Sequence, residues 1–510
     1  MQIVLFKRDL RLQDSVPLFL SMKGFRRSGA VLPLYIHEPS LIQQPDVARQ
    51  HQCVIHETLD EMAADIQSIG GKLLEQCGEA VQVLEGIHAR QPITKIWTHR
   101  ETTQSSQYAR DARVRAWCRT QGIELHEIAQ DGVARGSESR ETFPDYFTRA
   151  VQNPIRDPMG KDLSERFADL PVPCVDRTDV PLAAGKDKPG RHRGGRKAAM
   201  TLMDNFFQIR FIQAYPSNIS SPNSAWDGAS RLSTYLAYGI ISDREIFQRV
   251  DRLVSVEHGQ MSKVQFDKFQ SSARFYLDRL GWRRNYLQTF EDKPHLETEC
   301  MLPEFEGMRS ADYDQEAFER WKQGRTGFPY IDAAMRCLDH TGWQNMRLRA
   351  TVVSFATMNL WIPTTDVARF LARQYVDYSP GIHHTIHQIV AGTTSFESMM
   401  VYNPVKQGEH DPQGHFVRRW VPELSDLKAP ALHEPAMAEG HCSDKAKAEG
   451  YSPYPPAVVD HKATAKFARE QINRARMKGD KKTVSSKEKI QMIRPEGCSR
   501  AFSSSLIRKL

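Results

Sequence analysis

Residues 326–355 read TGFPYIDAAMRCLDHTGWQNMRLRATVVSF, and this stretch decides the class of the domain that contains it. Apolar side chains recur at helical spacing from Ile331 to Phe355, which predicts a pair of buried helices. Arg349 interrupts the apolar positions, and a buried arginine needs a partner because an unpaired charge in an apolar interior is very costly. Asp377 is the obvious partner. A purely structural ion pair in a helical core is the alternative that this pattern leaves open.

Two further segments follow this stretch. Residues 376–394 read VDYSPGIHHTIHQIVAGTT, a Pro-Gly break followed by a histidine-rich turn, and residues 401–424 read VYNPVKQGEHDPQGHFVRRWVPEL. The first stretch resembles the TGYP-VDAAMR-L-TGW-HNR-R block of the photolyase/cryptochrome family of flavoproteins. The last segment is similar to that family's FNP-QGEKFDP-G-FIR-W-PEL block, and both matches are far longer than a short motif. Weaker resemblance extends from Phe6 to about Lys462.

The N-terminal part of the chain alternates strand-like and helical patterns. Strands are expected at 2–6, 30–36, 72–76, 93–99 and 123–128, and helices at 49–69, 80–88 and 105–121. This alternation predicts an α/β domain with a doubly wound parallel sheet, although no G-x-G-x-x-G fingerprint is present. The opening FKRDLRLQDSVPL resembles the family's opening. We expect its arginines to tie the two domains together, with ordinary surface charge as the alternative.

The predicted organisation has four parts. They are an α/β photolyase-type antenna domain at 1–130, an inter-domain linker at 131–197, an all-α FAD-binding catalytic domain at 198–470 and a basic C-terminal tail at 471–510. The linker is rich in Pro, Gly and charge. Its segment 185–197 contains six Lys/Arg and one acidic residue. A solvated loop is the favoured interpretation of that run, and contact with phosphate is the alternative.

Composition limits the cellular setting. The net charge is +7, and the tail 471–510 accounts for it with eleven Lys/Arg against three Asp/Glu. Such a tail attracts polyanions, although a solvated end is an equally open interpretation. The eight cysteines stand singly and no secretory signal is apparent, so we expect reduced thiols and a cytoplasmic protein. No apolar run is long enough to span a bilayer, so no membrane association is expected, and we expect a monomer.

The segment SRLSTYLAYG at 230–239 places small hydroxyl residues before an apolar helix. Such a helix start is a ready anion site, and a plain N-cap is the alternative. The segment resembles the family's T-S-L-SPYL--G segment, which cradles the FAD diphosphate. The cofactor-binding set implied by the resemblance is Tyr215, Ser230, Arg231, Leu232, Ser233, Tyr276, Arg283, Met346, Arg349, Asp377, Ser379 and His383.

The resemblance implies a light-driven DNA photolyase that splits UV-induced pyrimidine dimers, with cyclobutane dimers favoured over (6-4) lesions. A dimer flipped out of UV-damaged DNA needs an aromatic pocket and basic walls. The expected catalytic residues are Trp282, His383 and His384, and the expected substrate contacts are Arg279, Trp282, Arg347 and Lys406. A core aromatic is the alternative for Trp282.

Several positions depart from the family pattern. Arg279 replaces a dimer-contacting glutamate, Met346 replaces a flavin-facing asparagine, and His383 replaces the asparagine opposite the reactive flavin nitrogen. His387 and Thr364 replace two tryptophans of the usual electron-transfer chain. Substitute electron carriers are expected among Trp343, Trp361, Tyr375 and Tyr378.

The histidines leave three roles open. A proton donor to a (6-4) lesion is one, because imidazole titrates near neutral pH. A metal site is disfavoured because the motif has no carboxylate or thiol partners, so no metal is expected. A core or flavin-facing role is preferred.

Two other functions remain open. One is a cryptochrome-like blue-light photoreceptor that binds FAD without repair, and the other is a flavin-binding, DNA-associated protein without photochemistry. The α/β domain would also be able to hold an antenna chromophore, namely a folate, a deazaflavin or a second flavin, and the sequence does not choose among them.

Overall fold

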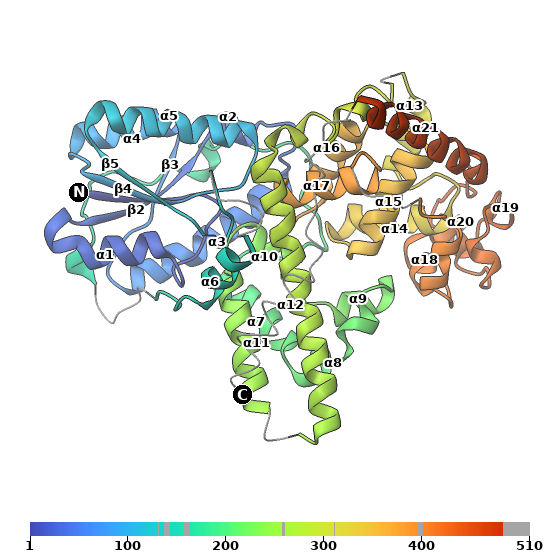
Figure 1. Cartoon of the computed structure of the whole chain (residues 1–510), viewed down its shortest axis with the longest axis horizontal. Coiled ribbons are helices and arrows are strands. Elements are labelled where there is room, and N and C mark those ends of the chain that lie inside the picture. Colours follow the sequence, from blue (N-terminus) through green and yellow to red (C-terminus); the bar gives the residue numbers. More distant parts are fainter. Residues whose placement is uncertain are drawn as a thin grey trace.

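The α/β domain is built on a five-stranded sheet (Figure 1). The computed structural model describes residues 1–130, 132–136, 143–157, 163–257, 261–310, 312–394 and 401–482. The strands are β1 Gln2–Phe6, β2 Val31–His37, β3 Leu74–Cys77, β4 Lys95–His99 and β5 Glu124–Ile128. They pair in parallel in the order β3-β2-β1-β4-β5, which confirms the predicted doubly wound sheet.

Helices cover both faces of this sheet because alternate strand residues point to opposite sides. Val4 and Phe6 belong to a core with helices α1 (Val16–Ser28) and α3 (Arg49–Ser68). Ile3 and Leu5 belong to a second core under α4 (Ala80–Arg90) and α5 (Ser105–Gln121), which lie on the opposite face (Figure 1). The short helix α2 (Pro39–Ile42) follows β2.

From Arg196 onward the chain is mainly helical, as predicted, and one helix, α6, lies in the segment before it. These helices are α6 Phe143–Gln152, α7 Arg196–Phe206, α8 Ile209–Asn218, α9 Pro222–Gly228, α10 Ser233–Ala237, α11 Asp243–Glu257, α12 Lys263–Asp292, α13 Gln315–Lys322, α14 Pro329–Thr341, α15 Met346–Ser354, α16 Thr364–Gln374, α17 Pro380–Val390, α18 His415–Trp420, α19 Pro435–Ala438, α20 Asp444–Ala448 and α21 His461–Lys482. A π-helical turn, Phe355–Asn359, extends α15. No helix in the described ranges is long and apolar enough to cross a membrane.

The deciding stretch folds as expected. Asn345 caps α15 by accepting the backbone N–H of Leu348, and Gly342 ends α14 in a left-handed conformation. Helices α14 and α15 pack into one apolar core with α16 and α18. The long helix α12 runs between this bundle and the α/β domain (Figure 1). It packs along α17 and α8.

Three local expectations were wrong or incomplete. The Pro380-Gly381 break begins helix α17 instead of a turn, because proline is well tolerated in the first helical turn. The expected linker contains helix α6. The sequence analysis missed this helix because its surroundings show no clear helical periodicity. Helix α21 continues through residue 470, where the tail was expected to begin. Residues 483–510 of that tail lie outside the described residues.

The basic segment 185–197 is solvated only in part: Lys186, Arg193 and Lys197 are exposed, whereas Lys188 and Arg191 are buried. Lys188 Nζ donates to the backbone oxygens of Leu338 (3.1 Å) and Asp339 (2.9 Å) in the helical domain. Arg191 forms a two-pronged ion pair with Glu57 of α3, at 2.7 and 3.0 Å. This run therefore clamps the two domains together.

The expectation about the N-terminal arginines is confirmed. Arg8 Nε donates to the backbone oxygen of Ala237 at 3.1 Å, and Arg11 donates to that of Gly239 at 2.9 Å. Both acceptors belong to α10 and the turn that follows it. Gly239 has φ +62°, and a Cβ there would lie 2.4 Å from the Arg8 carbonyl oxygen, so the contact requires glycine.

Candidate functional site

The predicted pair of Arg349 and Asp377 is present. Arg349 Nη2 lies 2.6 and 2.5 Å from the two carboxylate oxygens of Asp377, and its Nε donates to the Gln344 carbonyl oxygen at 3.1 Å. The Tyr375 ring lies beneath the guanidinium at 4.0 Å. Burial alone would lower the pKa of Arg349, but the adjacent Asp377 outweighs it and raises this pKa. The arginine therefore stays charged in a mostly buried position.

The segment Ser230–Thr234 lies next to the first stretch, as the two motifs require if they serve one ligand. Ser233 Oγ accepts a hydrogen bond from the Trp343 indole at 3.3 Å. Arg231 has φ +50°, a left-handed conformation that is uncommon for a non-glycine residue, and its guanidinium lies 4.5 Å above the Trp226 ring. Helix α10, which begins at Ser233, has only five residues. We therefore describe this site by its side chains and by the left-handed turn at Arg231, because α10 is too short to provide a helix N-terminus as a binding site.

The other expected cofactor residues surround this segment at different depths. The Tyr276 phenol lies beside Ser230, and the Tyr215 and Tyr276 rings meet edge to face at 5.3 Å. Burial raises the pKa of Tyr215 to about 12. Arg283 donates to the Leu236 carbonyl oxygen at 3.2 Å. Leu232 is fully buried, Ser379 is partly buried, and Met346 is 51% exposed at the start of α15.

Several buried donors of this region lack partners among the described residues. They are the Nε atoms of Arg231 and Arg347 and the Nε2 atom of His192. Buried polar groups are almost always hydrogen-bonded in native proteins, so these donors call for a ligand that carries acceptors. We call Ser230–Thr234, His192, Trp343, Arg349 and Asp377 the cofactor cradle. Its donors and aromatic rings suit a nucleotide-bearing cofactor such as FAD.

The expected substrate residues lie on helix α12 and its neighbours. Trp282 is partly buried and stacks on Tyr286, with ring centroids 5.8 Å apart. Arg279, one turn earlier, is exposed and lies over the Phe275 ring at 4.5 Å. Lys406 is exposed and Arg347 is partly buried. Trp282 therefore has a partly open aromatic face instead of a fully enclosed core position.

The three histidines occupy one buried side of α17. His383 Nε2 donates to the Ala368 carbonyl oxygen at 2.8 Å, and His387 Nδ1 donates to the His383 carbonyl oxygen at 2.7 Å. The His384 ring stacks on Phe290. Burial lowers the pKa of His384 to about 3 and that of His387 to about 4, and it holds the pKa of His383 well below its usual range. All three are therefore neutral near pH 7 and are poorly suited to donating a proton.

The proposed electron carriers fall into three separate groups. The Trp343 ring contacts Trp226 at 5.7 Å, whereas Trp361 contacts Phe467 of α21 at 5.2 Å. Tyr375 and Tyr378 both contact His383, at 6.2 and 5.1 Å. Within the described residues, no ring contact joins these groups.

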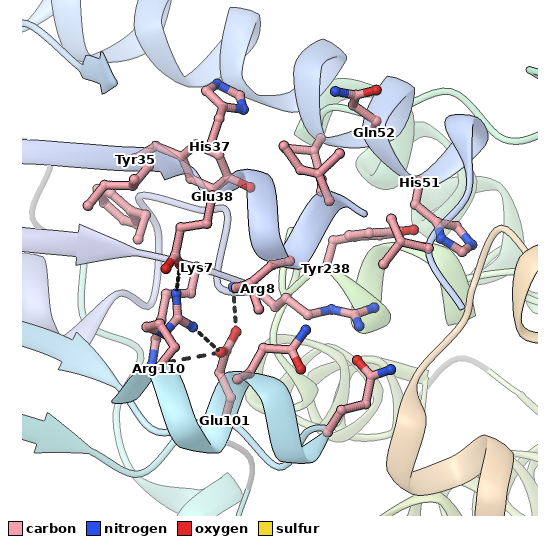
Figure 2. Close-up of a pocket in the computed structure, with 18 of the residues that line it drawn as sticks. Lys7, Arg8, Tyr35, His37, Glu38, His51, Gln52, Glu101, Arg110 and Tyr238 are labelled. Carbon is pink, nitrogen blue, oxygen red and sulfur yellow. Dashed lines mark hydrogen bonds and ion pairs between the residues drawn. The ribbon is translucent and has the colours of Figure 1, made fainter. Parts of the chain in front are cut away.

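A cavity opens at the carboxyl ends of the strands (Figure 2). This sheet-edge pocket has a volume of about 130 Å³ and lies where the strand order reverses, the usual ligand position in doubly wound sheets. Aliphatic side chains such as Ile42 and Ile55 line it together with the rings of Tyr35, Tyr238 and Tyr378. Flat, largely apolar molecules fit this lining.

Four charged groups of the sheet-edge pocket, Lys7, Glu38, Glu101 and Arg110, are linked by ion pairs (Figure 2). Arg110 contacts Glu38, Glu101 (3.3 Å) and Asp111 (2.7 Å). Lys7 donates to Asp111 at 3.0 Å, and the Arg8 backbone N–H donates to Glu101 at 2.7 Å. Burial raises the pKa of Glu38, while Arg110 opposes that shift.

One short segment separates the two sites. We call Tyr375–Tyr378 the strap; it contains Asp377 and borders the sheet-edge pocket through Tyr378. His51 Nε2 donates to the Tyr375 carbonyl oxygen at 2.9 Å, and the Tyr238 hydroxyl donates to the Val376 carbonyl oxygen at 3.0 Å. Arg8 donates to the Tyr378 carbonyl oxygen.

The strap is also held through the Tyr378 side chain. Its hydroxyl donates to Asp46 at 2.7 Å and accepts from Gln104 at 3.2 Å. Sequence reasoning missed His51, Asp46 and His192 because they match no motif. For His192 the sequence offered one signal, its place as a histidine within the basic segment 185–197, and for His51 and Asp46 it offered none.

Comparisons with known proteins agree with this architecture. The family model "DNA photolyase" matches residues 2–151, and the family model "FAD binding domain of DNA photolyase" matches residues 276–474. The deoxyribodipyrimidine photo-lyase of Streptomyces griseus is 29% identical over 488 residues, which cover 92% of this chain and 98% of that protein.

Solved structures share the fold. The cryptochrome of Synechocystis sp. PCC6803 superposes with a TM-score of 0.76 at 23% identity, covering 92% of this chain and 98% of that one. The photolyase of Sulfolobus tokodaii, described with two FAD molecules, gives 0.72 at 25% identity, covering 93% and 99%.

These features define a two-domain flavoprotein in which a photolyase-type α/β domain precedes a helical FAD-binding domain. The chain belongs to the photolyase/cryptochrome family, and its cofactor is FAD.

Proposed function

We propose that this protein is a light-driven DNA photolyase that splits UV-induced pyrimidine dimers. The main support is that one chain carries both the cofactor cradle, with its buried Arg349–Asp377 pair, and the Trp282–Tyr286 stack on α12, the helix whose Arg283 donates to the Leu236 carbonyl oxygen beside the cradle. When bound, FAD supplies the electron that splits the dimer. The protein's part is to hold the cofactor, to stack a flipped base and to keep a positive charge beside the cofactor.

Cyclobutane dimers are the favoured lesion. Repair of a (6-4) lesion was expected to use a histidine as proton donor, and the buried His383 and His384 are neutral near pH 7. A histidine that is unprotonated at the working pH has no imidazolium proton to give, so it contributes little to general-acid catalysis. The histidines instead support the bundle through α16 and α12, which fits the preferred core role.

The alternative is a cryptochrome-like photoreceptor without repair. The exposed Arg279, in place of a lesion-contacting glutamate, and the exposed Met346, in place of a flavin-facing asparagine, favour it. The sheet-edge pocket is compatible with both functions. We propose it as the site of a second chromophore, since its aromatic and aliphatic lining suits a flat ring system.

A repair assay with chemically reduced protein tests this proposal. Reducing the flavin chemically bypasses any intramolecular electron route, and restored thymine is then quantified after blue illumination of a thymine-dimer oligonucleotide. We expect dimer loss only in the light. Trp282→Ala should weaken binding to the damaged oligonucleotide by about 1–3 kcal/mol if Trp282 stacks on the flipped base. Trp420→Ala, which changes a partly buried tryptophan on α18, is the matched control.

The negative outcomes are equally informative. If FAD is bound but neither cyclobutane nor (6-4) DNA changes in the light, the photoreceptor becomes the better proposal. If Trp282→Ala binds lesion DNA as tightly as the unmodified protein and is folded, Trp282 belongs to the core.

A further inference from the structure

His192 lies in the middle of the basic segment that clamps the two domains. On one side Arg191 pairs with Glu57, and on the other the Gly194 N–H donates to the same carboxylate at 2.6 Å. The backbone here approaches α3 so closely that a Cβ on Gly194 would lie 2.3 Å from the Val54 carbonyl oxygen. The position of His192 is therefore fixed from the α/β side.

The His192 side chain points into the helical domain and is only 7% exposed. Its Nδ1 lies 2.9 Å from the Thr234 hydroxyl, within the segment assigned to the cofactor. Its ring is nearly parallel to that of Trp226, with centroids 6.2 Å apart, and it also contacts the Trp343 ring at 6.3 Å. A residue of the linker is thus built into the cofactor cradle.

The other ring nitrogen, Nε2, is buried and has no hydrogen-bond partner among the described residues. Burial lowers the pKa of His192 to about 4, with a further contribution from Arg231, so the ring is neutral near pH 7. We assign the Thr234 hydroxyl as the donor to Nδ1, because this tautomer leaves one buried polar group without a partner among the described residues, whereas the opposite tautomer leaves two. The ring proton then lies on Nε2, which becomes a buried donor without an acceptor.

The neighbouring Arg231 presents the same problem. Its Nε atom is buried and unpartnered in the described part of the chain, and its guanidinium covers the same Trp226 ring. A neutral N–H donor beside a cation suits an acceptor that is an anionic oxygen. The diphosphate is the part of FAD that offers such oxygens.

We propose that His192 is a cofactor-binding residue whose Nε2–H donates to a diphosphate oxygen of FAD, next to Arg231. This inference rests on the proposed role of Ser230–Ser233 as the diphosphate segment. It gives the linker a direct part in holding the cofactor, because the residues that clamp the domains also position this donor.

Two substitutions separate the two ring nitrogens. In His192→Asn the amide occupies the place of Nδ1, so the contact with Thr234 is kept and the Nε2 donor is lost. In His192→Gln the longer side chain returns an amide donor to the place of Nε2. We expect His192→Asn to raise the FAD dissociation constant about tenfold, the loss of one hydrogen bond to a charged group. We expect His192→Gln to recover most of that affinity.

The measurement is reconstitution of the flavin-free full-length protein with FAD, followed by quenching of flavin fluorescence, with thermal unfolding of each apoprotein alongside. A folded His192→Asn protein that binds FAD as tightly as the unmodified protein overturns the proposal. Riboflavin, which has no phosphate, serves as a second probe, and its affinity should be equal for both proteins. A parallel loss with riboflavin overturns the assignment to the diphosphate.

This test is independent of repair. If the unmodified protein binds FAD but restores no thymine, the proposed function fails while the His192 comparison still stands. If FAD affinity is normal in the unmodified protein and unchanged in His192→Asn, only the His192 inference fails.

Discussion

The sheet-edge pocket and the cofactor cradle both border the strap, but they differ in how far their buried polar groups are paired. In the pocket, Arg110, Glu38 and Asp111 satisfy one another. In the cradle, Arg231 and His192 keep buried nitrogens without partners among the described residues. Unsatisfied buried donors cost free energy until a ligand supplies acceptors.

This difference indicates different dependence on ligands. In the pocket the Arg110 network is paired without a ligand, while His56 Nε2 in the lining has no partner among the described residues, so an occupant adds mainly apolar and aromatic contacts. The cradle becomes complete only with an acceptor-rich ligand. We therefore expect FAD to contribute strongly to the stability of the folded protein, and any second chromophore to contribute less.

The largest effect is expected from Arg349→Ala. This change leaves the Asp377 carboxylate, whose side chain is 2% exposed, without its cation. Breaking a buried pair typically costs about 3–5 kcal/mol, and FAD should be lost as well. FAD content of the purified protein and urea unfolding provide the measurements. Arg369→Ala, at an exposed arginine of α16, is the control, and full flavin occupancy in Arg349→Ala would contradict the assigned role.

A smaller but clear effect is expected when the pocket's own network is broken. Arg110→Met removes the shared partner of Glu38, Glu101 and Asp111, and we expect a loss of stability of about 3 kcal/mol. FAD content should not change, because no cradle residue is touched. The double variant Arg110→Met/Glu38→Gln should recover part of the stability, since it removes the unpaired charge. Loss of FAD in the folded single variant would show that the two sites are not separate.

The smallest expected effect concerns His51, which borders the pocket and holds the strap. Its Nδ1 accepts the Ala48 N–H and its Nε2 donates to Tyr375, so the neutral ring is fully bonded. Burial lowers the pKa of His51 to about 4, with Arg8 and Lys188 adding to the shift and Asp377 opposing it. Because this value lies below the unfolded one, stability is lost as the pH falls from about 6.5 toward 4.

At pH 5 that loss is about 2 kcal/mol for this one group. His51→Gln keeps a donor to Tyr375 but cannot titrate. Urea unfolding at pH 7 and pH 5 should therefore show a smaller pH dependence for the variant, by about that amount. An identical pH dependence in both proteins would remove His51 as a source of acid sensitivity.

Much of the fold could be predicted from the sequence because its signals are local. Strands β1 and β2 are apolar runs, the other three strands alternate with helical segments, and Ile331–Phe355 shows helical spacing, so these elements were predicted close to their observed bounds. The pairing of Arg349 with Asp377 was also predicted, because a buried arginine needs an oppositely charged partner.

The missed features depend on long-range contacts. His51 and Tyr375 are 324 positions apart, and His192 meets Thr234 across 42 positions. Nothing local distinguishes His192 from its basic neighbours, which composition alone placed in solvent. Pro380 misled in another way, since the same residue that breaks a helix interior also starts a helix.

The strap has a consequence for how this chain can be divided. The segment that carries Asp377 is held by Tyr238 and Gln344 of the helical domain and also by Arg8, Asp46, His51 and Gln104, which come from the first 130 residues. The position of Asp377 in the FAD-binding domain therefore depends partly on side chains of the α/β domain. A chimaera that joins this helical domain to the α/β domain of a relative inherits a properly shaped flavin site only if those four side chains are transferred with it.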